Sequence, residues 1–432
     1  EVFPFRPQLE KFKNNVRGKM GIGVIGDYEP QPLIFGSKFR KKGYGLVHVG
    51  KVNNLDSLVE EAYKNDEGFN EMSLGGVNPV ELIASLINKG RDYADGIEIM
   101  QNSIEGSSSV MLLSGEGVYV ARDKFGRTPI NIGQKEGATG AAFESFSLKM
   151  LGFDLSNSLG PGEIGIITDR GYEQLKKPEE ISQLCGFLHV YYGGPAAVYN
   201  GVVSELARNN LGAMLAKSDK GLDKNDFNPD HVAGIPDSGT GSAIGYSNES
   251  KFPLLRTFVK YTETWQRSFM PQNQEMRKFV AQMKLIPIEE FIRGKEIVFS
   301  DDSLVRGTQS QQKFEVLYSL GIKKAHFRLS CPPLIFPCTG LNFSMSESVF
   351  DLAARRAIRE IDGESGDLSP YINPQSNKYH EMVDRVRHNV GVDTLKYQKL
   401  GDLVSAIGLP KKDLCTHCWD GCDSTKCYSK SK

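Results

Sequence analysis

Two neighbouring aspartates, Asp301 and Asp302, open the part of the sequence that is richest in groups able to bind a charged ligand. Residues 303–308 follow with two hydroxyls, an arginine and a glycine, and their backbone N–H groups can surround a phosphate at the start of a helix. Two adjacent carboxylates beside a phosphate would be repelled unless they met sugar hydroxyls or a divalent cation. The stretch therefore predicts a site for a phosphorylated sugar with Mg²⁺. A surface loop whose Asp-Asp-Ser merely caps a helix is the alternative.

The flanking residues predict the elements that position this stretch. Residues 297–299 are apolar, as in a buried parallel strand. Downstream, Phe314, Leu317 and Leu320 recur at helical spacing before Gly321, which can end the helix. The order strand, polar loop, helix places the acids at the carboxyl end of a strand, where open α/β sheets bind ligands.

A second stretch, residues 234–241 (Gly-Ile-Pro-Asp-Ser-Gly-Thr-Gly), follows a predicted strand at 231–233. Its glycines and hydroxyls let the backbone approach an anion closely, although a glycine-rich turn alone is weak evidence. Between the two stretches, residues 265–284 combine arginines, lysines and glutamines with Pro271, which predicts a mobile polar flap.

The composition of the chain restricts the class of protein to which it can belong. The 432 residues, 39% of them hydrophobic, suffice for two or three domains. The formal net charge of −1 gives no electrostatic attraction to nucleic acid or an anionic membrane, and no apolar run approaches the ~20 residues of a membrane span. Seven cysteines, four of them after residue 414, favour metal or cluster binding in a reducing cytosol over a disulfide framework, so we expect a cytoplasmic protein. Cys331, beside two prolines, is expected in the core.

The string at 301–309, Asp-Asp-Ser-Leu-Val-Arg-Gly-Thr-Gln, resembles the phosphoribosyl pyrophosphate (PRPP) signature of type I phosphoribosyltransferases. It is most similar to the version found in the amidophosphoribosyltransferase family, the glutamine-dependent first enzyme of purine synthesis; Leu304 and Gln309 are the departures. The resemblance extends over about residues 17–421. It implies an α/β and α+β protein. A partial N-terminal-nucleophile αββα sandwich of glutaminase type (residues 1–176) would precede a Rossmann-like phosphoribosyltransferase domain with a cysteine-bearing tail (177–432).

The same resemblance implies roles for individual residues. It implies PRPP binding by Asp237, Ser238, Gly239, Asp301, Asp302, Ser303, Arg306, Gly307 and Thr308. It implies Mg²⁺ binding by Ser238, Asp301 and Asp302, and catalytic contacts to pyrophosphate by Arg267 and Lys284 in the loop that closes over PRPP. It implies a [4Fe–4S] cluster of the family's iron–sulfur branch on Cys185, Cys338, Cys415 and Cys418, with Zn²⁺ as the alternative.

The chain departs from the family's pattern at several positions of the glutaminase half. Residue 1 is glutamate where the family has its nucleophilic cysteine. The family's arginine is absent near residues 23–28, its Asn-Gly oxyanion pair falls on Val49-Gly50, and the aspartate that holds glutamine falls on Pro79. We therefore expect this domain not to hydrolyse glutamine. Cys338 and Cys415 are also further apart than the family implies, so residues 363–377 are expected to form an inserted loop.

The resemblance implies an enzyme that joins ammonia to PRPP, giving 5-phosphoribosylamine and pyrophosphate. Glutamine or ammonia would supply the nitrogen to a homo-oligomer with no nucleic-acid or membrane partner. Two alternatives stay open: a phosphoribosyltransferase restricted to free ammonia or another amine, and a non-catalytic PRPP-binding regulator or scaffold.

Overall fold

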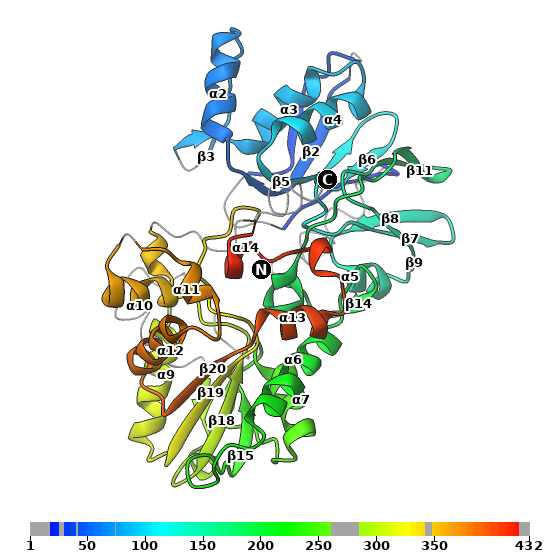
Figure 1. The fold of residues 1–432 in the computed structure, drawn as a ribbon. Helices are drawn as coiled ribbons and strands as arrows, with labels where there is room; N and C mark the ends of the chain where they lie inside the picture. Colours follow the sequence, from blue (N-terminus) through cyan, green and yellow to red (C-terminus); the bar gives the residue numbers. More distant parts are fainter. Residues whose placement is uncertain are drawn as a thin grey trace. The chain divides into compact units, whose positions relative to one another are not determined.

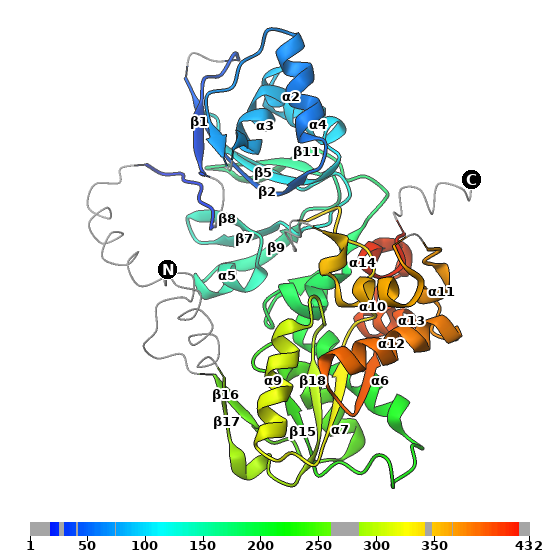
Figure 2. The ribbon, with the colours of Figure 1, turned by 90° about the vertical axis from the view of Figure 1, so that its left-hand side faces the viewer.

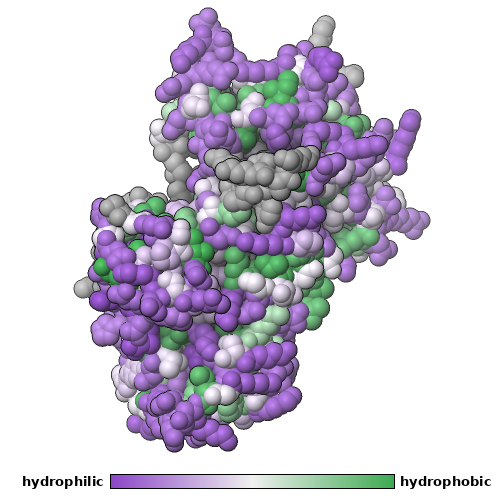
Figure 3. Space-filling view, viewed as in Figure 1, coloured by the Kyte–Doolittle hydropathy of each residue, from purple (hydrophilic) through white to green (hydrophobic). Residues whose placement is uncertain are grey.

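The computed structural model describes residues 18–25, 30–39, 42–73, 75–260, 285–341, 348–364 and 366–422. The chain divides into two compact units, one of Glu1–Phe143 with Ser147–Ser182 and one of Glu144–Phe146 with Gln183–Lys432. No helix within the described ranges is long and apolar enough to span a membrane. Polar residues cover most of the visible face of each unit, and hydrophobic residues form smaller separate areas on it (Figure 3).

The first unit is built on a six-stranded antiparallel sheet in the order β1-β2-β5-β6-β10-β11 (Figure 1). Its strands are β1 (Leu33–Phe35), β2 (Tyr44–Val52), β5 (Gly106–Leu113), β6 (Val118–Ala121), β10 (Ile164–Thr168) and β11 (Gly171–Lys176). One face packs against helices, with Leu46 and Leu112 of the sheet in one core with Ile83 and Ile97 of the helices. These helices include α3 (Pro79–Asn88) and α4 (Tyr93–Ser103), with α2 (Leu55–Lys64) beside them.

The other face of this sheet shares a second core with a smaller sheet. That sheet has the order β8-β7-β9 and contains β7 (Asn131–Lys135), β8 (Ala138–Ala142) and β9 (Asp154–Ser158). Val120 of the large sheet and Ile132 of the small sheet belong to this core. The layers are therefore helix, sheet and sheet. The remaining short elements are β3 (Met72–Ser73), β4 (Gly76–Val77) and α5 (Ser145–Met150).

Helix α3 forms where the apolar spacing predicts it. Val80, Ile83 and Ile87 are buried on its inner face. Asn78 caps the helix by accepting a hydrogen bond from the Val80 N–H at 2.9 Å, and Pro79 occupies the first helical position, where its missing N–H costs nothing.

The second unit has a parallel four-stranded sheet in the order β15-β18-β19-β20 (Figure 1), of which β15 and β18 can also be followed in Figure 2. The strands are β15 (His231–Gly234), β18 (Glu296–Asp301), β19 (Lys324–Leu329) and β20 (Thr394–Tyr397). Alternate residues of β18 serve opposite faces: Val298 joins a core with helices α6 (Ser204–Asp219) and α7 (Thr240–Ser250), whereas Ile297 and Phe299 join a core with α9 (Thr308–Ser319) and α12 (Asn377–Val390). Strand β15, strand β18 and helix α9 confirm the sequence prediction.

Smaller elements surround this sheet. They are β12 (Leu184–Cys185), the π-helix η1 (Leu188–Tyr192), β13 (Val198–Tyr199), β14 (Val202–Val203), β16 (Phe258–Lys260), β17 (Leu285–Pro287), η2 (Glu289–Phe291), η3 (Val349–Asp351), α10 (Ala353–Asp362), α11 (Ser369–Ile372), α13 (Leu400–Ile407), η4 (Lys411–Asp413), β21 (Leu414–Cys415) and α14 (His417–Asp420). The segment expected to be an inserted loop contains α11, whose Tyr371 is fully buried in the core. Leu368 and Ile372 pack against the same core, so part of this polar stretch forms a helical turn where the sequence predicts a loop.

Candidate PRPP site

Two polar loops meet at the carboxyl edge of the parallel sheet. Strands β15 and β18 are hydrogen-bonded neighbours, with Gly234 opposite Ser300, so the segments that follow them leave the sheet side by side. The Ile235 N–H donates to the Ser300 carbonyl oxygen at 2.9 Å. Gly239 is required here because a Cβ at this position would lie 1.9 Å from the same oxygen.

The predicted acid pair is buried and tied to the first loop. Asp301 Oδ1 accepts hydrogen bonds from the Ser238 hydroxyl at 2.6 Å and from the Asp302 N–H at 2.9 Å. The Ser303 hydroxyl donates to Asp302. Both residues are only 6% exposed, and burial raises the pKa of Asp301. Burial together with the charge of Asp301 raises the pKa of Asp302 well above its usual range. A divalent cation or sugar hydroxyls would compensate this negative charge.

The segment after the acids turns into a helix, as the sequence predicts. Gly307, with φ +79°, precedes α9, which begins at Thr308. The side chain of Arg306 is 57% exposed, and its guanidinium lies 3.8 Å from the Asp351 carboxylate. One edge of this sheet thus brings together Ser238, Gly239, Asp301, Asp302 and the 303–308 turn.

Asp237 is placed differently from its neighbours. Its side chain is 78% exposed and pairs with the Lys260 ammonium at 2.9 Å. Lys260 stands at the end of β16 and lies close to the site, yet no motif in the sequence marks it. Residues 261–284 lie outside the described residues, and the predicted flap with Arg267 and Lys284 falls within this range.

Tyr191 is a further group that sequence reasoning missed. Burial and the nearby charges of Asp302 and Asp301 raise the pKa of its phenol. It stands in the π-helix η1, whose backbone is held by Arg208. The Arg208 guanidinium donates to the carbonyl oxygens of His189, Tyr191 and Gly193 at 3.1, 2.9 and 2.6 Å. The influence of the acid pair on Tyr191 results from the fold, because the two segments lie far apart in the sequence.

The four cysteines predicted to bind a cluster come together from three parts of the chain. Strands β12 and β21 pair in parallel with Cys185 opposite Cys415. The Ile335 and Phe336 N–H groups donate to the Cys418 carbonyl oxygen at 3.0 and 3.1 Å, which brings the Cys338 loop to the tail. A hydrogen bond to Cys338, burial and the charges of the other cysteines raise the pKa of Cys418 well above its usual range. Cys331 is fully buried, as predicted.

No three or more His, Cys, Asp or Glu side chains of the described residues are arranged as ligands of a single metal ion. The donor types present are those that the two predicted groups prefer. Hard carboxylate and hydroxyl oxygens suit Mg²⁺, and a set of four thiols suits an iron–sulfur cluster.

Several known proteins are similar to this chain in sequence or in structure. No family model matches the chain. An amidophosphoribosyltransferase from Synechococcus elongatus is 30% identical over 358 residues, 80% of this chain and 69% of the relative. One from Methanothermobacter thermautotrophicus is 29% identical over 428 residues, 96% of this chain and 82% of the relative. The solved glutamine PRPP amidotransferase from B. subtilis, complexed with ADP and GMP, is similar with a TM-score of 0.75 and 26% identity, covering 91% of this chain and 80% of that chain.

The parallel sheet, its buried acid pair and these similarities are those of a phosphoribosyltransferase joined to an antiparallel sandwich. The chain belongs to the amidophosphoribosyltransferase family. The predicted fold class is thereby confirmed.

Proposed function

We propose that the chain transfers ammonia to PRPP: the amine nitrogen bonds to C1 of the ribose, the bond from C1 to pyrophosphate breaks, and 5-phosphoribosylamine, pyrophosphate and a proton result. One observation carries this proposal. The buried Asp301–Asp302 pair, hydrogen-bonded to Ser238, stands beside the turn that opens α9. Family membership supports the same reaction as the first step of purine synthesis.

Each group has a defined task in such a transfer. Asp301 and Asp302 would fix the ribose hydroxyls, and the N–H groups of the 303–308 turn would hold the 5-phosphate. The Ser238–Gly239 turn, together with Arg267 and Lys284, would bind the pyrophosphate leaving group. An oxocarbenium-like centre at C1 needs water excluded so that the amine attacks. No general base is required because ammonia is already a nucleophile.

The proposal also includes binding of Mg²⁺ and of an iron–sulfur cluster. Mg²⁺ held by Ser238, Asp301 and Asp302 would supply charge neutralisation for pyrophosphate. A [4Fe–4S] cluster on Cys185, Cys338, Cys415 and Cys418 would join the tail to the Cys338 loop, a structural task for which Zn²⁺ is the alternative. We further propose a homo-oligomer that works in the cytoplasm.

We also propose that the first unit does not hydrolyse glutamine. Where the family has an oxyanion-hole asparagine, the chain has Val49, whose side chain carries no hydrogen-bond donor. Where the family has the aspartate that holds glutamine, the chain has Pro79, which starts α3. Gly50 remains, with φ +140° and no room for a Cβ beside the Ser107 carbonyl oxygen. Transfer from free ammonia is therefore the version of the reaction that we favour.

The test is pyrophosphate release from PRPP and Mg²⁺, measured in parallel with ammonium and with glutamine. Release with ammonium alone is the expected result. Release with glutamine at a comparable rate would overturn the proposal for the first unit. Binding of PRPP without turnover of either nitrogen donor would favour the non-catalytic regulator.

A further inference from the structure

Helix α10 contacts the phosphate-binding turn from outside the site. The Ala353 N–H donates to the Val305 carbonyl oxygen at 2.7 Å. The Arg356 guanidinium, one turn further along, donates to the Arg306 carbonyl oxygen. Two successive carbonyls of the turn are thus held by two residues of one helix.

These contacts determine where the N–H groups of the turn point. In a trans peptide the C=O and the following N–H face opposite ways. Because the carbonyls of Val305 and Arg306 are turned toward α10, the N–H groups of Arg306 and Gly307 point away from it. Ordered N–H donors of this kind are what an anion-binding turn requires.

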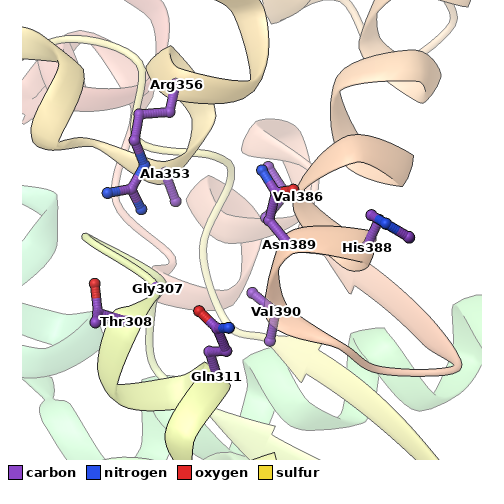
Figure 4. Close-up of a pocket in the computed structure, with 9 residues that line it drawn as sticks. All are labelled: Gly307, Thr308, Gln311, Ala353, Arg356, Val386, His388, Asn389 and Val390. Atoms are coloured by element: carbon purple, nitrogen blue, oxygen red, sulfur yellow. The ribbon is translucent and has the colours of Figure 1, made fainter. Parts of the chain in front are cut away.

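Arg356 lies beside the turn in a cavity. It lines a cavity of about 430 Å³ between α9, α10 and α12 (Figure 4). The lining residues include no carboxylate: Gly307, Thr308, Gln311, Ala353, Arg356, Val386, His388, Asn389 and Val390. In Figure 4 the guanidinium extends from α10 toward Thr308 at the start of α9. A Cβ on Gly307 would lie 3.6 Å from Ala353 Cβ and 3.8 Å from Arg356 Nη2, so helix and turn are in contact.

We propose that Arg356 is a positioning residue for the phosphate-binding turn, acting through the Arg306 carbonyl to orient the turn for the 5-phosphate of PRPP. This inference rests on the proposed function. It predicts that loss of Arg356 weakens binding of the 5-phosphate but not of pyrophosphate, because pyrophosphate would be bound by the Ser238–Gly239 turn.

The experiment is calorimetry of the full chain with PRPP, ribose 5-phosphate and pyrophosphate, each with Mg²⁺. Arg356→Ala removes one charged hydrogen bond, so we expect affinity for PRPP and ribose 5-phosphate to fall about tenfold, with pyrophosphate affinity and Tm unchanged. Arg356→Lys, which can still donate to the carbonyl, should recover most of the loss. Arg359→Ala is the matched control. Arg359 stands on the same helix, with its guanidinium 4.7 Å from the Phe350 ring centroid and 3.8 Å from Glu364, and its removal should change none of the three affinities.

The outcomes separate this inference from the proposed function. Unchanged ribose 5-phosphate affinity in Arg356→Ala, or an equal loss for pyrophosphate, would overturn the positioning role. If Arg356→Ala lowers Tm, Arg356→Gln carries the same comparison. A wild-type chain that binds neither PRPP nor ribose 5-phosphate would refute the proposed function itself.

Discussion

At the scale of single residues, the acid pair is the sharpest test of the site. Asp302→Asn keeps the size of the side chain but removes one of two buried carboxylates. Loss of a charged interaction with Mg²⁺ or ribose should lower kcat/KM for pyrophosphate release about 10- to 100-fold. Asp384→Asn, an exposed acid of α12 paired with Arg387 at 2.7 Å, is the control and should be neutral. Equal activity of the two variants would contradict the assignment.

A second residue, Asp219, lies in a buried cluster of charges that we expect to stabilise the second unit. Its buried carboxylate accepts hydrogen bonds from Arg328 Nε at 2.7 Å and the Tyr246 hydroxyl at 2.6 Å, and Lys396 also donates to it. Burial acts to raise its pKa, but the charges of Arg328 and Lys396 outweigh burial and hold the pKa below its usual value. The folded state therefore gains stability above the unfolded-state pKa of about 3.9, and this gain is lost as the pH falls through the lower folded value.

Asp219→Asn should thus destabilise the chain by about 3–5 kcal/mol at pH 7, because it leaves the Arg328 charge buried without its partner. The measurement is urea unfolding at pH 7 and at pH 3.5. The gap between variant and wild type should narrow at the lower pH. A gap that is independent of pH would show that the carboxylate charge is not the cause.

At the scale of elements, we expect the site to depend on the close contact between the 234–241 loop and β18. Gly239→Ala places a methyl group where the Ser300 carbonyl oxygen stands, so α7 and its loop must shift. We expect a cost of about 1–3 kcal/mol and a loss of pyrophosphate release. Gly366→Ala, where a Cβ would meet nothing within 4 Å, is the matched control. Wild-type stability and activity in Gly239→Ala would argue against a fixed loop geometry.

Some of the helices and strands could be predicted from the sequence, and others could not. Strand β18, helix α9 and helix α3 follow from apolar periodicity, because each buries one face against a sheet or supplies the sheet itself. The turn of helix at α11 could not be predicted in this way, since its contacts are with a core built from distant segments, on which Leu368, Tyr371 and Ile372 pack. Tyr191 and Lys260 belong to no motif, and their nearness to the acids results from the fold alone.

At the scale of the whole molecule, the pairing of β12 with β21 brings Cys185 opposite Cys415, although the two residues lie far apart in the sequence. If they bind a cluster, Cys415→Ser should lose iron and acid-labile sulfide from protein purified without oxygen. Cys422→Ser, which changes a neighbouring cysteine outside the predicted set, should keep both. Zinc without iron in the wild type would support the alternative metal, and equal loss in both variants would contradict the assignment of ligands.

The residue types and their order in the 234–241 and 301–309 strings already predict carboxylates, hydroxyls and N–H donors at the ends of two strands. Which residues these strings contact depends on the folded chain. Parallel pairing of β15 with β18 set Ser238 against Asp301, and docking of α10 turned the carbonyls of Val305 and Arg306. Such contacts depend on packing between residues far apart in the chain, which no local pattern encodes.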